Sequence, residues 1–328
     1  NALEVEVASV ADCPFAGKDL FMARANIVVA GSANTDMFIL MDALPSAGET
    51  HIGGEFQTKP GGKGANQAVA AARAGSAVCL IANLGDDLFG KNTVETLVKE
   101  RVSIDFVSLD RHAPTGVAMI MVDAAGQNMI AVAPGANSML TPKHIEKAQP
   151  RIKDADFLLL QMEIPLDTVS YAIELAHDER TPVVLNAAPA PRSALPSDLI
   201  AKVDTLIVNE FEAAVLSGTR VDSPADGERA AQTLRNMGAK RVVITLGSRG
   251  ALALGDKLFS VSAKTVEAVD TVGAGDAFCG ALVTALGEGF EFADAVSFAN
   301  AAAALACTRV GAQASLPART DIESFWKQ

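Results

Sequence analysis

A glycine-rich turn near the end of the sequence carries a carboxylate at the start of an apolar, helix-forming run. Residues 270–276 read DTVGAGD, and Ala277 and Phe278 begin the run. Glycines in such a turn free backbone N–H groups, and the positive end of the following helix attracts an anion. Asp276 could take a proton from a substrate hydroxyl. The turn therefore predicts a phosphate site with a general base built into it, the combination that phosphoryl transfer requires.

A second constellation lies at residues 60–67, which read PGGKGANQ. Three glycines open a loop that runs directly into a helix, and Lys63 and Asn66 share one face of its first turn because they are three residues apart. Such a turn can offer a small polar ligand backbone N–H groups, a cation and an amide. A flexible loop with a solvated lysine explains these residues equally well when they are taken alone.

Short β-branched runs alternate with longer alanine-rich or amphipathic segments from about Ala25 onward. The pattern predicts strands at residues 27–30, 78–83, 157–161, 182–186, 205–209 and 241–246. It predicts helices at 63–74, 88–100, 165–177, 196–202, 210–217 and 225–237. This order is typical of an α/β fold with a mainly parallel central sheet.

Two regions, at about residues 36–58 and 115–134, depart from this alternation. They contain extended segments at 37–41, 50–58, 117–122 and 129–132, joined by turns rich in Gly and Asp. We expect them to form a small antiparallel sheet that projects from the main domain as a lid. Two separate surface hairpins are the alternative, since hairpins are common.

Composition and charge restrict the class of protein. The 328 residues are 49% hydrophobic and carry 27 basic against 39 acidic side chains, a net charge of −12 without any basic tract. Nucleic acid and anionic membranes are therefore not expected as partners, and no apolar stretch approaches the roughly 18 residues of a membrane span. The four scattered cysteines indicate reduced thiols in a cytoplasmic protein. Residues 1–24 are expected to be a leader or disordered extension, and 25–328 one domain.

Two nucleotide-binding motifs are excluded by the residues around them. Residues 85–92 have the spacing of a P-loop, but Asp86 and Asp87 would repel a phosphate and Asn92 replaces the required hydroxyl. An ordinary strand-to-helix turn is the expected structure there. Gly31 after the first strand is not followed by the further glycines of a dinucleotide-binding fingerprint, which removes the main support for a dehydrogenase.

The two glycine-rich segments occur together with five further short motifs. These are GSANTD at 31–36, QME at 161–163, NAAPA at 186–190, NEFE at 209–212 and TLGSRG at 245–250. In this order, over about residues 26–325, the set resembles the ribokinase-like carbohydrate kinases, also called the phosphofructokinase-B family. The resemblance implies a three-layer α/β/α fold with a mainly parallel central sheet and a small β-sheet lid.

The resemblance also implies the catalytic residues. Asp276 would be the base that deprotonates the primary hydroxyl of a sugar, which then attacks the γ-phosphate of ATP in line. Backbone N–H groups of Ala274, Gly275 and Asp276 would form an anion hole in the catalytic turn that Gly273 opens. On its own residue type, Asp276 could instead be a helix N-cap aspartate.

By the same resemblance, two sets of residues would bind the substrates. The sugar set is Asn34, Asp36, Gly62, Lys63, Asn66 and Glu163, with Asp276 as the last contact. The nucleotide set is Asn209, Glu212, Thr245, Gly247, Ser248, Gly250, Gly275 and Asn300, with Mg²⁺ bridging the phosphates. Taken singly, several of these have simpler explanations as turn residues, a solvated loop acid or a helix cap.

A potassium site is implied beside the anion hole. One ligand would be the side chain of Asp270. The others would be the backbone carbonyls of Val272, Ala306, Arg309 and Gly311, and Ser315 would lie nearby. Carbonyl ligands leave almost no trace in a sequence, and Asp270 could serve only to brace the turn.

The resemblance implies an ATP-dependent sugar kinase that converts D-ribose to ribose 5-phosphate and ADP. A 2-deoxyribose, nucleoside or other sugar kinase of the same family is the alternative, and a non-catalytic sugar or nucleotide sensor is a further one. The lid carries apolar residues such as Phe38, Leu40, Ile120 and Met121 on alternating faces, which need cover on at least one side. The resemblance implies that two lids cover each other, and we expect a homodimer paired through the lid.

Overall fold

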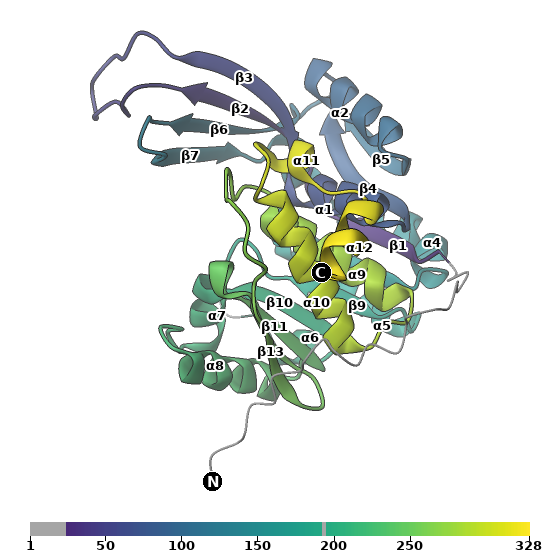
Figure 1. Ribbon diagram of the computed structural model, residues 1–328. Helices are drawn as coiled ribbons and strands as arrows, with labels where there is room; N and C mark the ends of the chain where they lie inside the picture. The colour runs from purple at the N-terminus through teal and green to yellow at the C-terminus, as the bar shows by residue number, and fades with distance from the viewer. Residues whose placement is uncertain (1–23, 192–194) are drawn as a thin grey trace.

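The computed structural model describes residues 24–191 and 195–328, so nearly all of the expected leader lies outside the described residues. A nine-stranded sheet forms the centre of the molecule (Figure 1). In spatial order its strands are β13 (Leu258–Val261), β12 (Ala251–Leu254), β11 (Arg241–Thr245), β10 (Thr205–Asn209), β9 (Val183–Asn186), β8 (Phe157–Leu160), β1 (Asn26–Ala30), β4 (Ala77–Gly85) and β5 (Val102–Asp110). All neighbours are parallel except at β12 and β13, which form an antiparallel edge.

Alternate residues of the central strands bury opposite faces of the sheet, as a strand period of two requires. On one face, Ile27 and Val29 belong to a core built with α1 (Lys63–Ala74), α2 (Leu88–Lys99), α9 (Ala274–Gly287), α10 (Phe292–Ala306) and α12 (Arg319–Trp326). On the other, Val28 and Ala30 belong to a core built with α3 (Pro142–Lys147), α4 (Gln149–Lys153), α5 (Leu166–Asp178), α6 (Ser197–Ile200), α7 (Glu210–Ser217) and α8 (Pro224–Asn236). The expected three-layer α/β/α architecture is confirmed.

Three strands were not predicted: the two edge strands of the sheet and the neighbour of one of them. These are β5, β12 and β13. The latter two have only four residues each, too few to show a period. The turn at residues 85–92 is an ordinary strand-to-helix connection, because Asp87 caps α2 by accepting a hydrogen bond from the Gly90 N–H at 2.8 Å.

The lid is a second sheet that projects from the main body (Figure 1). Its strands, in spatial order, are β3 (Glu55–Gly61), β2 (Asn34–Leu40), β6 (Gly116–Val122) and β7 (Asn128–Ala133). The expectation of a purely antiparallel sheet is wrong, because β2 and β6 pair in parallel. Each follows soon after a parallel strand of the main sheet, β1 or β5, so both leave the same edge in the same direction.

This edge, where the parallel strands end, collects the polar motifs. Asn34, Gln161, Asn186 and Asn209 lie at or just beyond the carboxyl ends of β1, β8, β9 and β10. The sheet order places β1 between β8 and β4, so the chain connections diverge there, which is where ligands bind in open α/β sheets. No described helix is long and apolar enough to cross a bilayer.

Candidate active site

Asp276 lies in the first turn of α9 and is only 7% exposed. Gly273 caps this helix with φ 83°, and a Cβ there would come within 2.9 Å of the Ala312 Cα, so the turn requires glycine. The Ala274 N–H donates to the Thr271 carbonyl at 3.3 Å. Within the described part of the chain, the N–H groups of Gly275 and Asp276 donate no hydrogen bond. The beginning of α9 thus offers two free amides beside a buried carboxylate, as an anion hole needs.

Gly275 is not required by the fold itself. It is exposed, its φ is not positive, and a Cβ built on it would meet no atom within 4 Å. Gly275 does line the cavity that Asp276 also borders. A phosphate that approaches the backbone closely gives glycine a reason to be there.

Both carboxylate oxygens of Asp276 accept hydrogen bonds from α1. Asn66 Nδ2 donates to Oδ2 and Gln67 Nε2 donates to Oδ1, each at 2.9 Å. Burial raises the pKa of Asp276, while the Lys63 ammonium and these two amides lower it, and the net pKa is raised from 3.8. A carboxyl group tuned in this way is a better base near neutral pH than an exposed aspartate.

Lys63 lies among acids that keep it charged. Burial alone would lower the pKa of Lys63, but Asp276, Glu163 and Glu212 outweigh it, so the pKa is raised. The carboxylate of Glu163 accepts hydrogen bonds from the Lys63 backbone N–H at 3.0 Å and from Ser32 Oγ at 2.5 Å. Glu163 therefore fixes the start of α1 and is not the solvated loop acid of the simpler explanation.

Asp36 and Asn34 share one face of β2, as their spacing predicts, and both are buried. The Asp36 carboxylate lies over Gly61, where any Cβ would collide with it. Burial raises the pKa of Asp36 to about 7, and the negative charges of Glu163 and Asp276 contribute to the rise. Gly62, with φ 87°, brings its backbone against Ala33, since a Cβ there would lie 2.7 Å from the Ala33 Cα. All six residues of the expected sugar set thus lie in β2, in the loop after β8 or at the start of α1.

Asp276 also lines a cavity of about 240 Å³. Its lining includes Lys63, Thr271, Gly273 and Asp276, together with four residues of the expected nucleotide set: Asn209, Glu212, Thr245 and Gly275. Asn209 and Glu212 also cap α7 reciprocally, since each accepts a hydrogen bond from the other's backbone N–H, at 2.8 and 2.9 Å. The capping explanation and a place in the cavity are therefore both correct.

The remaining expected nucleotide residues do not line this cavity. Gly247 and Ser248 form the short turn η3 (Gly247–Arg249) after β11, and Gly250 follows with φ 94°. A Cβ at Gly250 would collide with the Val261 carbonyl, so this glycine is required by the β11–β13 region of the fold. Asn300 on α10 is buried and donates to the Ser262 carbonyl at 2.8 Å.

Asp270 braces two segments of the expected cation site. Its carboxylate accepts the Val272 N–H at 2.9 Å and the Gly311 N–H at 2.8 Å. Arg309 donates its N–H to the Ala306 carbonyl at 3.4 Å, and Ser315 Oγ donates to the Ala312 carbonyl at 2.9 Å within α11 (Ala312–Ser315). The structure brings Asp270, Val272 and Gly311 together, and bracing accounts for the Asp270 carboxylate as it stands.

Four polar residues of the site were not identified from the sequence as site residues. They are Ser32, Gln67, Asn137 and Asn186: the first three form hydrogen bonds with residues of the expected sets, and Asn186 accepts one from Gln67. Three of them, Gln67, Ser32 and Asn186, lie within the motifs given above, and this position is the feature of the sequence that could have identified them. Asn137 lies in the short helix η2 (Gly135–Met139), far along the chain, and nothing in its surroundings indicated a role.

Comparison with known proteins agrees with this geometry. A model of the pfkB family carbohydrate kinases matches residues 24–319. The chain is similar to a ribokinase of Schizosaccharomyces pombe, with 40% identity over 91% of this chain and 96% of the relative. It is also similar to a deoxyribokinase of Salmonella typhi, with 36% identity over 92% of this chain and 97% of the relative.

The fold has a close counterpart among solved structures. Arabidopsis thaliana ribokinase complexed with ribose and ATP superposes with a TM-score of 0.86 and 31% identity, covering 93% of this chain and 100% of that one. The expected enzyme class and the expected resemblance are thereby confirmed. The chain belongs to the pfkB family of carbohydrate kinases.

Proposed function

We propose that this protein transfers the γ-phosphate of ATP to the 5-hydroxyl of D-ribose, giving ribose 5-phosphate and ADP. One observation carries the proposal: Asp276 accepts a hydrogen bond from Asn66, among the buried polar residues of β2 and α1, and it also lines a cavity together with Gly275 at the free amides of α9. A sugar bound among those polar residues and a nucleotide bound in the cavity would meet at its carboxylate. The ribokinase bound to ribose and ATP that shares this fold supports the same pair of ligands.

Asp276 accepts the proton of the sugar's primary hydroxyl as the oxygen attacks the γ-phosphorus. The new O–P bond forms in line with the bond between the γ-phosphorus and the β–γ bridging oxygen. That bond breaks, and the bridging oxygen leaves as part of ADP. Charge on the transferring phosphoryl group is stabilised by the N–H groups of Gly275 and Asp276, and by that of Ala274 if it turns away from Thr271. Aligned amides of this kind lower a barrier by about 3 kcal/mol each.

Mg²⁺ would neutralise the phosphates of the nucleotide. Among the described residues, no three acidic, histidine or cysteine side chains cluster around a possible ion. This donor set fits a magnesium ion held mainly by phosphate and water, with Glu212 at the cavity wall as the nearest acid of the expected nucleotide set. Lys63, kept charged by three acids, would attract the same phosphates.

We also propose that a potassium ion binds beside the anion hole. The observation in favour is that Asp270 draws the backbone of Val272 and Gly311 to one place, next to the turn that carries Gly273. Held there, an ion would fix the turn and so the free amides. Turnover measured with K⁺ and with tetramethylammonium replacing it tests the site directly, since only the first fits a cage of carbonyls.

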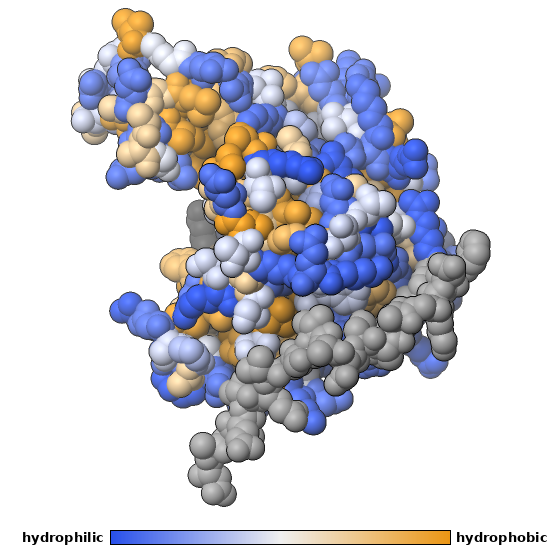
Figure 2. Space-filling model, in the orientation of Figure 1, coloured by the Kyte–Doolittle hydropathy of each residue, from blue (hydrophilic) through white to orange (hydrophobic). Residues whose placement is uncertain are grey.

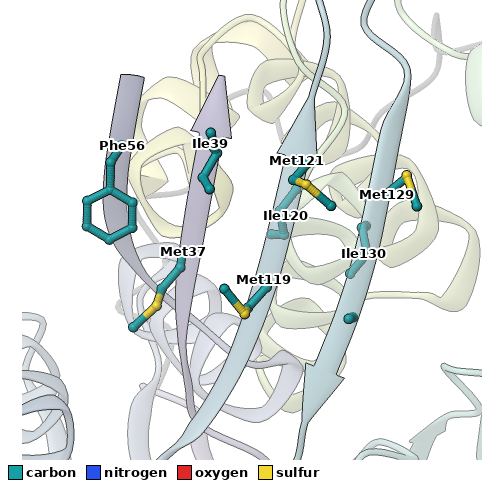
Figure 3. Close-up of a pocket in the computed structure, with 9 residues that line it drawn as sticks. Met37, Ile39, Phe56, Met119, Ile120, Met121, Met129 and Ile130 are labelled. Atoms are coloured by element: carbon teal, nitrogen blue, oxygen red, sulfur yellow. The ribbon is translucent and has the colours of Figure 1, made fainter. Parts of the chain in front are cut away.

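The lid supports a dimer. Met37, Ile39, Phe56, Met119, Met121 and Met129 line an apolar cavity of about 240 Å³ on one face of the four strands (Figure 3). Figure 2 shows hydrophobic side chains gathered over the same projecting sheet, and Phe56 and Met119 are 62% and 54% exposed. A second copy of this face would cover them.

A cytoplasmic setting is supported by the free thiols of Cys79, Cys279 and Cys307, whereas Cys13 lies outside the described residues.

Asp276→Asn is the direct test of the reaction. It keeps the shape and the burial of the side chain but removes the base, so ADP release should fall at least about a hundredfold while ribose still binds.

A panel of ribose, 2-deoxyribose and nucleosides, each with ATP and Mg²⁺, decides the substrate. The similar deoxyribokinase makes 2-deoxyribose the second candidate, and a higher kcat/KM for that sugar would replace ribose in this proposal.

A further inference from the structure

Gln67 makes three hydrogen bonds in the fully buried space beneath the site. Its Nε2 donates to Asp276 Oδ1 at 2.9 Å and to Asn186 Oδ1 at 3.0 Å. Its Oε1 accepts from Gln161 Nε2 at 2.8 Å. The side chain is 0% exposed, so the amide has protein partners for its oxygen and for both of its N–H groups.

A backbone carbonyl fixes the direction of these amides. The Ile207 carbonyl can only accept, so Asn186 turns its Nδ2 toward it, at 3.2 Å. Asn186 Oδ1 then faces Gln67, which must present Nε2. The same NH₂ group reaches Asp276, so the orientation of Gln67 follows from the backbone of β10.

We propose that Gln67 is a positioning residue for phosphoryl transfer: it holds Oδ1 of Asp276 as an acceptor, so that the carboxylate stays ionised and keeps one orientation. This inference rests on the proposed role of Asp276 as the base. The other oxygen, Oδ2, accepts one hydrogen bond from Asn66 of the expected sugar set and takes the proton on its remaining lone pair. Gln67 thus ties the base to the main sheet through Asn186, whereas Asn66 ties it to the sugar side.

The substitution Gln67→Met removes none of the titratable side chains around Asp276. They are Lys63 on α1, Asp36 on β2, Glu163 after β8, Glu212 on α7 and Cys279 on α9. A change in the titration of the base on substitution of Gln67 therefore reports the lost hydrogen bond. Loss of one hydrogen bond to a charged group corresponds to about one to two pH units.

The test is the pH dependence of the single-turnover rate of ADP formation, which isolates chemistry from product release. Gln67→Met is a substitution of similar volume. In this variant the acidic limb of the pH–rate profile should move to higher pH by about one to two units. Below the shifted pKa each unit lowers the rate about tenfold, while the KM for the sugar changes less than about threefold. Gln67→Glu, which keeps the shape and places a carboxyl group against Oδ1, should move the limb in the same direction and serves if Gln67→Met does not fold.

Two further substitutions separate this role from simple loss of buried packing. Gln161→Met removes an equally buried amide without touching Asp276, so it should lower the unfolding temperature comparably and move the limb less. Gln149→Met replaces a glutamine that binds only Glu179 and should leave the rate unchanged. An unmoved limb in both Gln67 variants, or an equal shift in Gln161→Met, overturns the inference.

Comparison with Asp276→Asn distinguishes the two proposals. If Asp276→Asn loses turnover but the Gln67 variants keep the wild-type pH profile, only the positioning role fails. If Asp276→Asn retains turnover, the assigned base and the positioning role fail together. In Asp276→Asn, addition of Gln67→Met should have little further effect on the residual rate, because the contact it removes no longer serves a base.

Discussion

Asn137 Nδ2 donates a hydrogen bond to Asn34 Oδ1 at 2.7 Å, and this contact fixes which end of the Asn34 amide can face a ligand. The direction of Asn137 is itself determined, because its Oδ1 accepts the Ala33 N–H at 2.9 Å and its Nδ2 faces the Ala33 and Pro134 carbonyls. Asn34 must therefore turn its oxygen toward Asn137 and its N–H groups away from it. At this position the site presents a hydrogen-bond donor, which suits a sugar hydroxyl oxygen.

Asn137→Asp tests this assignment with an isosteric change. The new carboxylate can still accept the Ala33 N–H, but its second oxygen faces the Ala33 and Pro134 carbonyls as well as Asn34. The variant should therefore be less stable, and in the folded variant the Asn34 amide turns and presents its acceptor to the sugar. We expect the KM for ribose to rise about tenfold, equivalent to one hydrogen bond of roughly 1.4 kcal/mol, with kcat nearly unchanged. Ser138→Ala, at an exposed neighbour that binds only Gly135, is the control. An unchanged KM would show that Asn34 does not donate to the sugar.

Sugar binding should release a proton from Asp36. Burial and two nearby acids raise the pKa of Asp36 to about 7 in the free protein, whereas hydrogen bonds from sugar hydroxyls to the carboxylate favour its charged form and lower the pKa. The sign follows: binding at pH 7 expels a proton, and ribose affinity rises as pH increases through about 7. Titration calorimetry in two buffers of different ionisation enthalpy measures the proton. Asp36→Asn should abolish the difference between buffers, and persistence of the difference would assign the proton to another group.

The sequence was informative wherever a residue type is tied to a local backbone geometry or a strong period. The buried parallel strands and the helices between them follow from runs such as Ile27–Ala30 and their spacing. The glycine turns at 61–64 and 273–275 were found because glycine is chemically conspicuous. The resemblance supplied the roles of the residues between them, and the geometry is consistent with Asp276, Asn66 and Lys63 as neighbours.

Other features depend on contacts between distant segments, which leave no local pattern. The parallel pairing of β2 with β6 joins segments about 80 residues apart and follows from where β1 and β5 end. The contact between Asn137 and Asn34 spans 103 residues. The sequence predicts no separate role for Gln67, the last residue of its motif. The acceptors that give it one, Asn186 and Asp276, come from β9 and α9.

The exposed apolar face of the lid should control assembly. Met119 lies in the middle of this face and is 54% exposed (Figure 3). In Met119→Glu, a second copy could cover the face only by burying a charge, which costs several kcal/mol. Sedimentation velocity at micromolar concentration should show a dimer for the wild type and a monomer for the variant. Leu88→Glu, at an exposed leucine that begins α2, should remain dimeric. A wild-type monomer would remove the lid pairing altogether.

Two glycines of the same turn should respond differently to alanine. Gly273→Ala forces a Cβ to within 2.9 Å of Ala312 at φ 83°, so we expect a loss of about 1–3 kcal/mol in the free energy of unfolding. Gly275→Ala meets no atom within 4 Å in a helical position, so stability should be unchanged or higher by up to about 1 kcal/mol. Turnover of Gly275→Ala should nevertheless fall about a hundredfold, because the methyl group would crowd a phosphoryl group held at the free amides of this turn.

Urea titration and steady-state ADP release measure both quantities on the same preparations. Stability and activity then separate at Gly275, where the fold tolerates a side chain and the reaction does not, but fall together at Gly273. Full activity in Gly275→Ala would mean that the phosphoryl group does not pass over the first turn of α9, and the anion hole would have to be sought elsewhere along the cavity that Lys63 and Glu212 line.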